Sequence, residues 1–217
     1  MFKAVLFDLD GTLADTAPDL CNALNLMRAA RNLAPVPLEK TRPVTSSGAR
    51  GLLGAGFGIA PGHADYEAMR DEFLANYERD VCRETTLFPG MAELLAALES
   101  AGTPWGIVTN KAERFTHPLL REMGLHHRAA CIIGGDTTPH AKPHPAPLLA
   151  ASERLALPPA ACLYVGDDER DMIAGRAAGM RVAAAAYGYL GHGKPPQEWE
   201  ADFHLEAPLE ILALLQD

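Results

Sequence analysis

The sequence predicts an α/β fold with a mainly parallel sheet and an inserted helical segment. Strand-like apolar segments alternate with helical ones over most of the chain, and one long stretch near the amino terminus contains helical segments only. Alternation of this kind builds parallel sheets through βαβ crossovers. The chain has 217 residues, of which 48% are hydrophobic, enough for one domain that carries a smaller insert.

Short apolar segments give the predicted strands, at residues 4–7, 105–109, 131–134, 163–165 and 181–185. Helical segments separate them, several with proline or glycine at their ends, at residues 91–100, 113–123, 146–155 and 171–178. The segment 181–185 is rich in alanine, which prefers helices, so its assignment as a strand depends on its place in the alternation.

Residues 14–87 interrupt the alternation. They contain helical segments at 20–31 and 66–80 and no convincing strand. The insert leaves the predicted sheet close to its carboxyl edge and returns to it before residue 88, so we expect it to form a lid that excludes water. The glycine-rich stretch 48–58 follows no strand, which favours a bend between lid helices over a phosphate-binding loop.

Composition excludes several classes of protein. There are 19 Lys and Arg against 28 Asp and Glu, a formal net charge of −9, which argues against nucleic acid or an anionic membrane surface as the partner. The four cysteines lie far apart, so neither a disulfide framework nor a zinc site is indicated. With no predicted signal peptide or spanning segment, we expect a cytoplasmic monomer or weak homodimer that acts on a small molecule.

The most informative feature is the pair of acids at Asp8 and Asp10, where the first predicted strand breaks into a turn at Gly11. We expect Asp8 at the carboxyl end of the strand and Asp10 on the loop beyond it. Open α/β sheets bind ligands at that edge. Two carboxylates so placed need a cation or a proton between them.

Two further strand ends carry groups suited to phosphate. Thr109 and Asn110 follow the second strand and offer a hydroxyl and backbone N–H groups. Lys142 lies in a loop kept non-helical by Pro143 and Pro145, where one ammonium group suits a phosphoryl group, although a solvated surface lysine is the alternative.

A third strand end carries more acids, at Asp167, Asp168 and Asp171. Asp168 and Asp171 are also well placed to cap the helix that follows and to complement its dipole. That alternative is weaker for Asp167, which directly follows the strand.

These motifs, taken in order, resemble those of the haloacid dehalogenase-like (HAD) phosphatase superfamily. They read Asp8-x-Asp10-Gly11-Thr12, Thr109-Asn110, Lys142-Pro143 and Gly166-Asp167-Asp168, and the resemblance covers the whole chain. It is closer to the phosphoglycolate phosphatase group, and closer still to bacterial N-acetylmuramic acid 6-phosphate phosphatases, through residues 16–19, 48–50, 105–111, 166–171 and 187–189. The resemblance implies a doubly wound, Rossmann-like core at 1–14 and 88–217 and a helical cap at 15–87.

The resemblance also implies Mg²⁺-dependent hydrolysis of a phosphate monoester through an aspartyl-phosphate. A phosphate monoester carries about two negative charges near neutral pH, so an anionic nucleophile approaches only if cations screen it. Asp8 is then the nucleophile, Asp10 the general acid and base, and Lys142 a screening cation. Thr109 and Asn110 would bind the transferring oxygens.

The implied metal ligands are the Asp8 carboxylate, the Asp10 backbone carbonyl and Asp167, with waters and phosphate completing an octahedron. Asp168 and Asp171 are both candidates for contact with the metal through water, and the pattern leaves open which of them makes it.

The predicted lid offers one group of specificity residues, Ser46, Ser47 and Arg50. An arginine in that loop could form a fork to a substrate carboxylate, with a surface salt bridge as the alternative. N-Acetylmuramic acid 6-phosphate is the leading candidate substrate and 2-phosphoglycolate the other.

Other classes of protein share part of this chemistry. A phosphoacceptor signalling domain also uses an aspartate, acids, threonine and lysine at strand ends, but a lid has no purpose there and Asp10 promotes turnover. A dehalogenase needs neither the Asp10 acid nor Mg²⁺. A phosphomutase is only weakly excluded.

Overall fold

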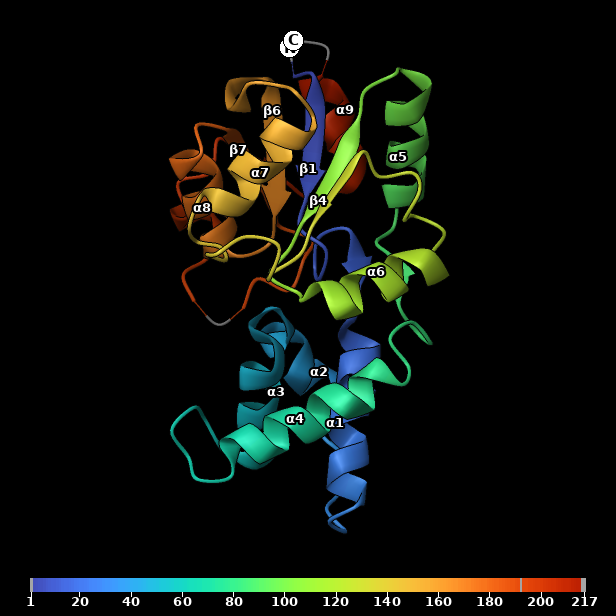
Figure 1. Cartoon of the computed structure of the whole chain (residues 1–217), viewed down its shortest axis with the longest axis vertical. Coiled ribbons are helices and arrows are strands. Elements are labelled where there is room, and N and C mark those ends of the chain that lie inside the picture. The colour runs from blue at the N-terminus through green and yellow to red at the C-terminus, as the bar shows by residue number, and fades with distance from the viewer. Residues whose placement is uncertain (1, 192, 216–217) are drawn as a thin grey trace.

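The computed structural model describes residues 2–191 and 193–215 (Figure 1). Within these residues the main sheet has six strands, and every neighbouring pair is parallel. In spatial order they are β5 (Cys131–Ile133), β4 (Trp105–Val108), β1 (Ala4–Phe7), β6 (Cys162–Gly166), β7 (Arg181–Ala185) and β8 (Phe203–Leu205). The predicted α/β class is confirmed, and the predicted strands agree with the observed ones to within one residue. Strand β8 was not predicted because it is a short edge strand with only Leu205 buried.

Strand β1 lies at the centre of the sheet, and all its residues are buried. Its side chains alternate between two hydrophobic clusters: Val5 and Phe7 belong to one and Ala4 and Leu6 to the other. A strand covered on both faces reads as a continuous apolar run, which is the pattern that predicted it.

Helices cover both faces of the sheet, as in a doubly wound fold. Helices α5 (Met91–Ser100), α6 (Glu113–Glu122) and α9 (Ile211–Leu214) contribute to the cluster of Phe7. Helices α7 (Ala146–Arg154) and α8 (Glu169–Ala177) contribute to the cluster of Leu6. The carboxyl ends of the strands are left open between these layers and face the insert.

The insert lies at the carboxyl edge of the sheet as a separate group of helices (Figure 1). It consists of α1 (Ala17–Ala29), α2 (Leu38–Thr41), the 3₁₀ helix η1 (Arg42–Ser47), α3 (Gly48–Phe57) and α4 (Tyr66–Glu78). Two short antiparallel strands, β2 (Ala14–Asp15) and β3 (Thr86–Leu87), join it to the sheet domain. The expectation that residues 14–87 hold no strand is wrong, because β2 and β3 lie at the two ends of this range. Each of these strands has only two residues, too few to give a periodic pattern in the sequence. The division into a core at 1–14 and 88–217 and a cap at 15–87 stays a prediction.

The glycine-rich stretch is a helix, α3, and the predicted bend is wrong. Helix α3 packs closely on α1, and a Cβ added at Gly56 would lie 2.5 Å from Cδ1 of Leu24. Glycine therefore allows α3 to approach Leu24 closely, which offsets its poor helix propensity. The predicted loop at Ser46 and Ser47 is likewise helical, because these residues end η1.

Asp19 fixes the start of α1 to the segment that returns to the sheet. Its buried carboxylate accepts hydrogen bonds from the backbone N–H groups of Arg83, Glu84 and Thr85 and from the Thr85 hydroxyl, at 2.7–3.1 Å. The two segments that connect the insert to the sheet domain are thereby held together. No helix in the described part of the chain is long and apolar enough to cross a membrane.

Candidate active site

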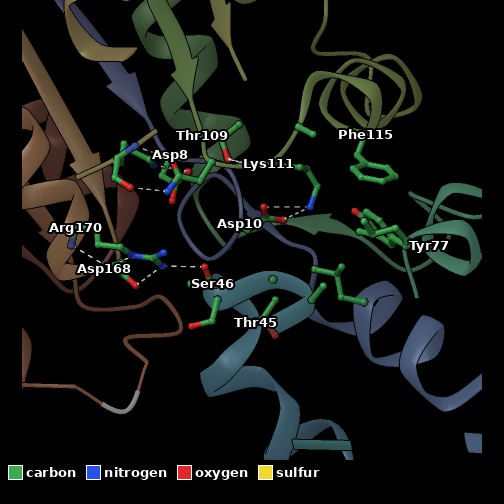
Figure 2. A pocket seen from close by; sticks show the side chains of 18 of the residues that line it. Asp8, Asp10, Thr45, Ser46, Tyr77, Thr109, Lys111, Phe115, Asp168 and Arg170 are labelled. Atoms are coloured by element: carbon green, nitrogen blue, oxygen red, sulfur yellow. Dashed lines mark hydrogen bonds and ion pairs between the residues drawn. The ribbon is translucent and has the colours of Figure 1, made fainter. Parts of the chain in front are cut away.

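The site residues predicted in the core lie at the carboxyl ends of adjacent strands, and Figure 2 shows Asp8, Asp10 and Thr109 among them. Asp8 follows β1, Thr109 follows β4, and Asp167 follows β6, while Lys142 comes from the loop after β5. Because β4, β1 and β6 are neighbours, residues about a hundred positions apart in the sequence come into contact. Asp8, Thr109 and Lys142 line a cavity of about 320 Å³ between the sheet and the insert.

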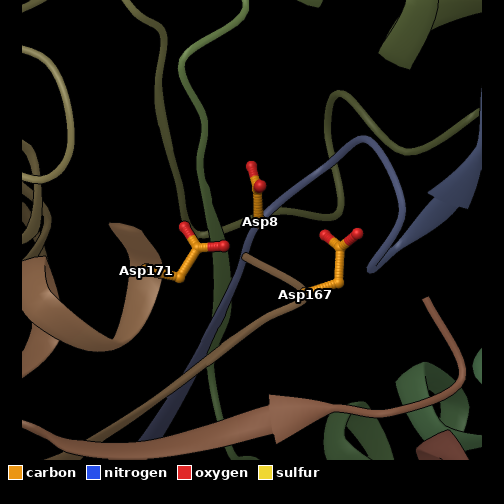
Figure 3. Close-up of side chains that lie close together, drawn as sticks. All are labelled: Asp8, Asp167 and Asp171. Atoms are coloured by element: carbon orange, nitrogen blue, oxygen red, sulfur yellow. The ribbon is translucent and has the colours of Figure 1, made fainter. Parts of the chain in front are cut away.

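Three carboxylates lie close together at this edge of the sheet, and two of them, Asp8 and Asp171, line the cavity (Figure 3). One oxygen each of Asp8, Asp167 and Asp171 lies within 4.8 Å of the others, and all three residues are buried. Burial, and then the charges of Asp8 and Asp171, raise the pKa of Asp167 well above its ordinary value. Without a cation, these buried carboxyl groups do not ionise readily together. The cluster is therefore suited to binding a cation.

The donor set at this cluster fits Mg²⁺, which binds oxygen ligands and takes few of them from protein. Asp8 and Asp167 are both predicted ligands, and the structure brings their carboxylates together. Burial is also the main cause that raises the pKa of Asp8 to about 6, opposed by Lys142 and reinforced by Asp171 and Asp10. A divalent cation would relieve this repulsion.

Asp167 is held by three hydrogen-bond donors. The Thr12 hydroxyl donates to its Oδ1 at 2.9 Å, the Tyr189 backbone N–H donates to its Oδ2 at 2.9 Å, and the Ser46 hydroxyl lies 3.4 Å from Oδ2. Gly11 has a φ of +86°, and a Cβ there would lie 2.2 Å from Asp167 Oδ2. Only glycine therefore allows the turn after Asp10 to pass this carboxylate.

Lys142 is buried, and four oxygen atoms lie close to its ammonium group. Its Nζ lies 3.0 Å from Asp8 Oδ1, 2.7 Å from Asp171 Oδ1, 2.7 Å from the Tyr164 hydroxyl and 3.0 Å from the Val108 carbonyl oxygen. Burial alone would lower the pKa of Lys142, but the ion pairs with Asp171 and Asp8 outweigh it and the pKa is raised. The alternative of a solvated surface lysine is wrong for this residue.

Asp168 and Asp171, which the sequence left as equal candidates, lie in different surroundings. Asp168 is the N-cap of α8, and the Asp171 carboxylate accepts a hydrogen bond from the Asp168 backbone N–H. The predicted capping is therefore present for both residues. Asp168 also forms an ion pair with Arg170 at 2.8 Å. Asp171 lies in the carboxylate cluster and contacts Lys142, which makes it the better candidate for contact with a bound metal.

Asp10 lies beside the cluster and is itself paired. Its carboxylate lies 2.8 Å from Lys111 Nζ and accepts a hydrogen bond from the Thr16 hydroxyl. The Lys111 side chain is only 7% exposed, and its ammonium lies 4.8 Å from the Tyr77 ring centroid. Sequence reasoning gave Lys111 no role, although its position directly after Thr109 and Asn110 was the signal that could have indicated one.

Thr109 and Asn110 both line the cavity. The Thr109 backbone N–H is used by the sheet, where it donates to the Ile133 carbonyl, so its hydroxyl is the group that faces the cavity. The Asn110 side chain exchanges two hydrogen bonds of 2.9 Å with the Lys142 backbone. Asn110 therefore also holds the Lys142 loop, a function that the sequence did not indicate.

The lid residues divide into two groups. Ser46 and Ser47 line the cavity, as expected. Arg50 is exposed on α3 and is absent from the cavity lining within the described residues, so the expected fork from Arg50 to a substrate carboxylate is not supported by its position. Arg170 does line the cavity, and it donates a hydrogen bond of 2.9 Å to the Ser46 carbonyl across the gap between core and insert.

Similarity to known proteins agrees with this geometry. The chain is 46% identical over 209 residues to the N-acetylmuramic acid 6-phosphate phosphatase of Pseudomonas putida, over 96% of this chain and 94% of that protein. It is 45% identical, over the same shares, to a phosphoglycolate phosphatase of Xanthomonas campestris pv. campestris. A crystal structure of a predicted phosphoglycolate phosphatase from Haemophilus somnus has a TM-score of 0.86 and 29% identity, covering 99% of this chain and 98% of that chain.

The family model described as haloacid dehalogenase-like hydrolase matches residues 5–185, a range that contains the four motifs. The resemblance noted in the sequence is thereby confirmed, together with the doubly wound fold. This chain belongs to the haloacid dehalogenase-like hydrolase family.

Proposed function

We propose that the protein is a Mg²⁺-dependent phosphatase that hydrolyses a small phosphate monoester through an aspartyl-phosphate on Asp8. The observation that carries this proposal is the buried cluster of Asp8, Asp167 and Asp171 with Lys142 inserted against it. A cation and an ammonium group beside one carboxylate are what a dianionic phosphate needs in order to approach a carboxylate nucleophile.

Asp8 is the nucleophile in this proposal. The Leu9 backbone N–H, at 2.7 Å, and Lys142 Nζ both contact its Oδ1, so Oδ2 is the oxygen left for attack on phosphorus. Attack forms the bond from Asp8 to phosphorus and breaks the bond from phosphorus to the ester oxygen. Lys142 stays paired throughout and keeps Asp8 oriented.

Asp10 moves the protons. It gives a proton to the departing ester oxygen, and then takes one from the water that attacks the phosphoaspartate. The second attack releases inorganic phosphate and restores Asp8. The Thr109 hydroxyl donates a hydrogen bond to a phosphoryl oxygen, a role supported by its position in the cavity lining.

Mg²⁺ would be held by Asp8, Asp167 and the Asp10 backbone carbonyl, with Asp171 in contact through water. The chemistry that the ion supplies when bound is neutralisation of the charge on the phosphoryl oxygens. All four cysteines are free, which favours a reducing compartment, and we place the enzyme in the cytoplasm as a monomer or weak homodimer.

N-Acetylmuramic acid 6-phosphate is the leading candidate substrate, since the Pseudomonas putida relative carries that name. The cavity volume supports it: 320 Å³ falls at the lower end of the range of roughly 300–1,000 Å³ that holds drug-sized ligands, more than a two-carbon acid needs. The alternative, 2-phosphoglycolate, is supported by the name of the Xanthomonas relative.

A side-by-side measurement of kcat/KM on the two phosphates, with Mg²⁺ present, tests the proposal. We expect the sugar phosphate to be preferred. A tenfold preference for 2-phosphoglycolate, about 1.4 kcal/mol of transition-state binding, would reverse the ranking. Phosphate release from an aryl phosphate after exhaustive chelation of metal would contradict the Mg²⁺ requirement.

A further inference from the structure

Four Lys and Arg side chains line the cavity, and three of them are paired with carboxylates. The paired cations are Lys111, Lys142 and Arg170. The fourth is Arg114, the second residue of α6, which is exposed. Among residues 2–191 and 193–215 its side chain has no ion pair and no hydrogen bond. Its charge is therefore available to a ligand.

The position of Arg114 in α6 does not explain its charge. It lies in the first turn of the helix, where the helix dipole favours an anion over a cation. The nearby carboxylates are engaged elsewhere: Glu113 accepts a hydrogen bond from the Thr137 hydroxyl, and Asp136 accepts one of 2.7 Å from the Glu113 backbone N–H. The guanidinium carbon lies 4.5 Å from the Phe115 ring centroid, a cation–π contact that leaves its N–H donors free.

Arg114 lies on the side of the cavity where the leaving group departs. Lys111 Nζ is 2.8 Å from Asp10 Oδ1 and 4.8 Å from the Tyr77 ring centroid. The Tyr77 and Phe115 centroids are 5.5 Å apart (Figure 2), and Arg114 packs on Phe115. In the proposed function Asp10 protonates the departing ester oxygen, so the leaving group lies on this side of the phosphorus. While Asp10 carries that proton, Lys111 has no ionised partner there, and this side of the cavity holds two cations.

We infer that Arg114 determines specificity by binding a carboxylate of the leaving group with its guanidinium group. This inference rests on the proposed function and deepens it, because it gives the start of α6 the role that the sequence predicted for Arg50. The planar guanidinium group matches a carboxylate through two parallel N–H donors. A hydrogen bond between charged groups corresponds to roughly 10- to 100-fold in kcat/KM.

Two matched pairs of substrates isolate the charge. N-Acetylmuramic acid 6-phosphate and 2-phosphoglycolate are each compared with their own primary carboxamide, which keeps the shape of the acid and removes its charge. For the full-length protein with Mg²⁺ we expect kcat/KM to be about tenfold or more higher for the acid than for its amide in at least one pair. Arg114→Gln should bring this ratio close to one. Arg114→Lys should keep part of the preference, because the charge remains.

Arg121→Gln is the matched control, because Arg121 is an exposed arginine in the last turn of the same helix and is not among the described residues that line the cavity. It should keep the wild-type ratio. Thermal unfolding checks the fold, and Arg114→Gln should not lower the melting temperature, since the helix dipole disfavours a cation at that position.

Two results would overturn the inference alone: a wild-type ratio near one for both pairs, or the wild-type ratio retained in Arg114→Gln. No phosphate release from any ester, an aryl phosphate included, would overturn the proposed function and the inference with it.

Discussion

The strand-end site and the insert differ in how firmly their side chains are held. Lys142 has four oxygen neighbours, and Asp171 is held by Lys142, the Tyr164 hydroxyl and the Asp168 backbone N–H. On the insert, Ser47 and Arg50 are exposed, and Ser46 reaches the core through Arg170 and, at 3.4 Å, Asp167. The reacting groups are held by buried contacts, while the exposed side chains of Ser47 and Arg50 on the insert are held less firmly.

This difference assigns separate tasks to the two regions. A rigid set of charges favours one transition state whichever alcohol leaves, because the charges act on the phosphoryl group. Selection among alcohols is then the task we assign to the insert, together with Arg114 at the start of α6. Substitutions at the strand-end site should therefore change the rate for every ester, and substitutions in the insert or at Arg114 should change the ratio between esters.

The largest effect is expected from Asp8→Asn, which keeps the side-chain volume and removes the nucleophile. Steady-state turnover on all esters should fall by roughly 10,000-fold or more. The melting temperature should hold or rise, because the substitution removes one charge from a crowded set of acids whose burial raises the pKa of Asp8 to about 6. Near-normal hydrolysis by the folded variant would contradict the proposed mechanism.

The second largest effect is expected from Asp10→Asn, which tests whether Asp10 is the acid that protonates the leaving group. General acid catalysis contributes roughly 100- to 10,000-fold and matters most for poor leaving groups. We expect a large loss with an alkyl phosphate such as a sugar phosphate and a much smaller one with an aryl phosphate. Equal losses on the two esters, measured under the same Mg²⁺ concentration, would exclude Asp10 as the acid.

Much of the core could be predicted from the sequence, and for a physical reason. Buried parallel strands read as apolar runs, and the residues after them must meet at one edge of the sheet. Asp8, Thr109, Lys142 and Asp167 each follow a strand or lie in the loop beyond it, so the sequence predicts that they lie close together. Their roles in catalysis stay predictions.

The insert was harder to predict because its contacts are between distant residues with no local pattern. Gly56 lies within α3 at the point where that helix packs on Leu24, a contact that the local sequence does not indicate. Tyr77 and Phe115 meet from two separate helices, one in the insert and one in the core. Arg50 is a charged residue in a polar segment, and the sequence alone does not show that it lies exposed on α3.

A third prediction concerns the pH dependence of Mg²⁺ binding at the carboxylate cluster of the core. Asp8, with its pKa raised to about 6 chiefly by burial, holds a proton below that pH, and a cation must displace it. Mg²⁺ affinity measured by calorimetry should therefore weaken as pH falls, by up to about tenfold per unit below pH 6 from Asp8 alone. Asp167, whose pKa is also raised, acts in the same direction.

The same pKa shifts determine whether the stability of the metal-free protein rises or falls with pH. A carboxyl whose folded pKa exceeds its ordinary value of 3.8 binds more protons when folded, so the metal-free protein loses stability as pH rises from about 4 through 6. Saturating Mg²⁺ should remove that loss, and unfolding curves with and without the ion would show it. Equal Mg²⁺ affinity at pH 5 and pH 7 would rule out this carboxylate cluster as the metal site.

The smallest effect is expected from Arg50→Ala on the insert. Arg50 is exposed and lies outside the cavity lining of the described residues, so kcat/KM should stay within about twofold for esters with and without a carboxylate, as for most exposed positions. Arg170→Gln is the matched arginine variant, since Arg170 lines the cavity and bonds to the Ser46 carbonyl, and it should change kcat/KM more. A selective tenfold loss on carboxylate-bearing esters in Arg50→Ala, with Arg170→Gln unaffected, would show that the insert moves far enough on binding to bring Arg50 to the substrate.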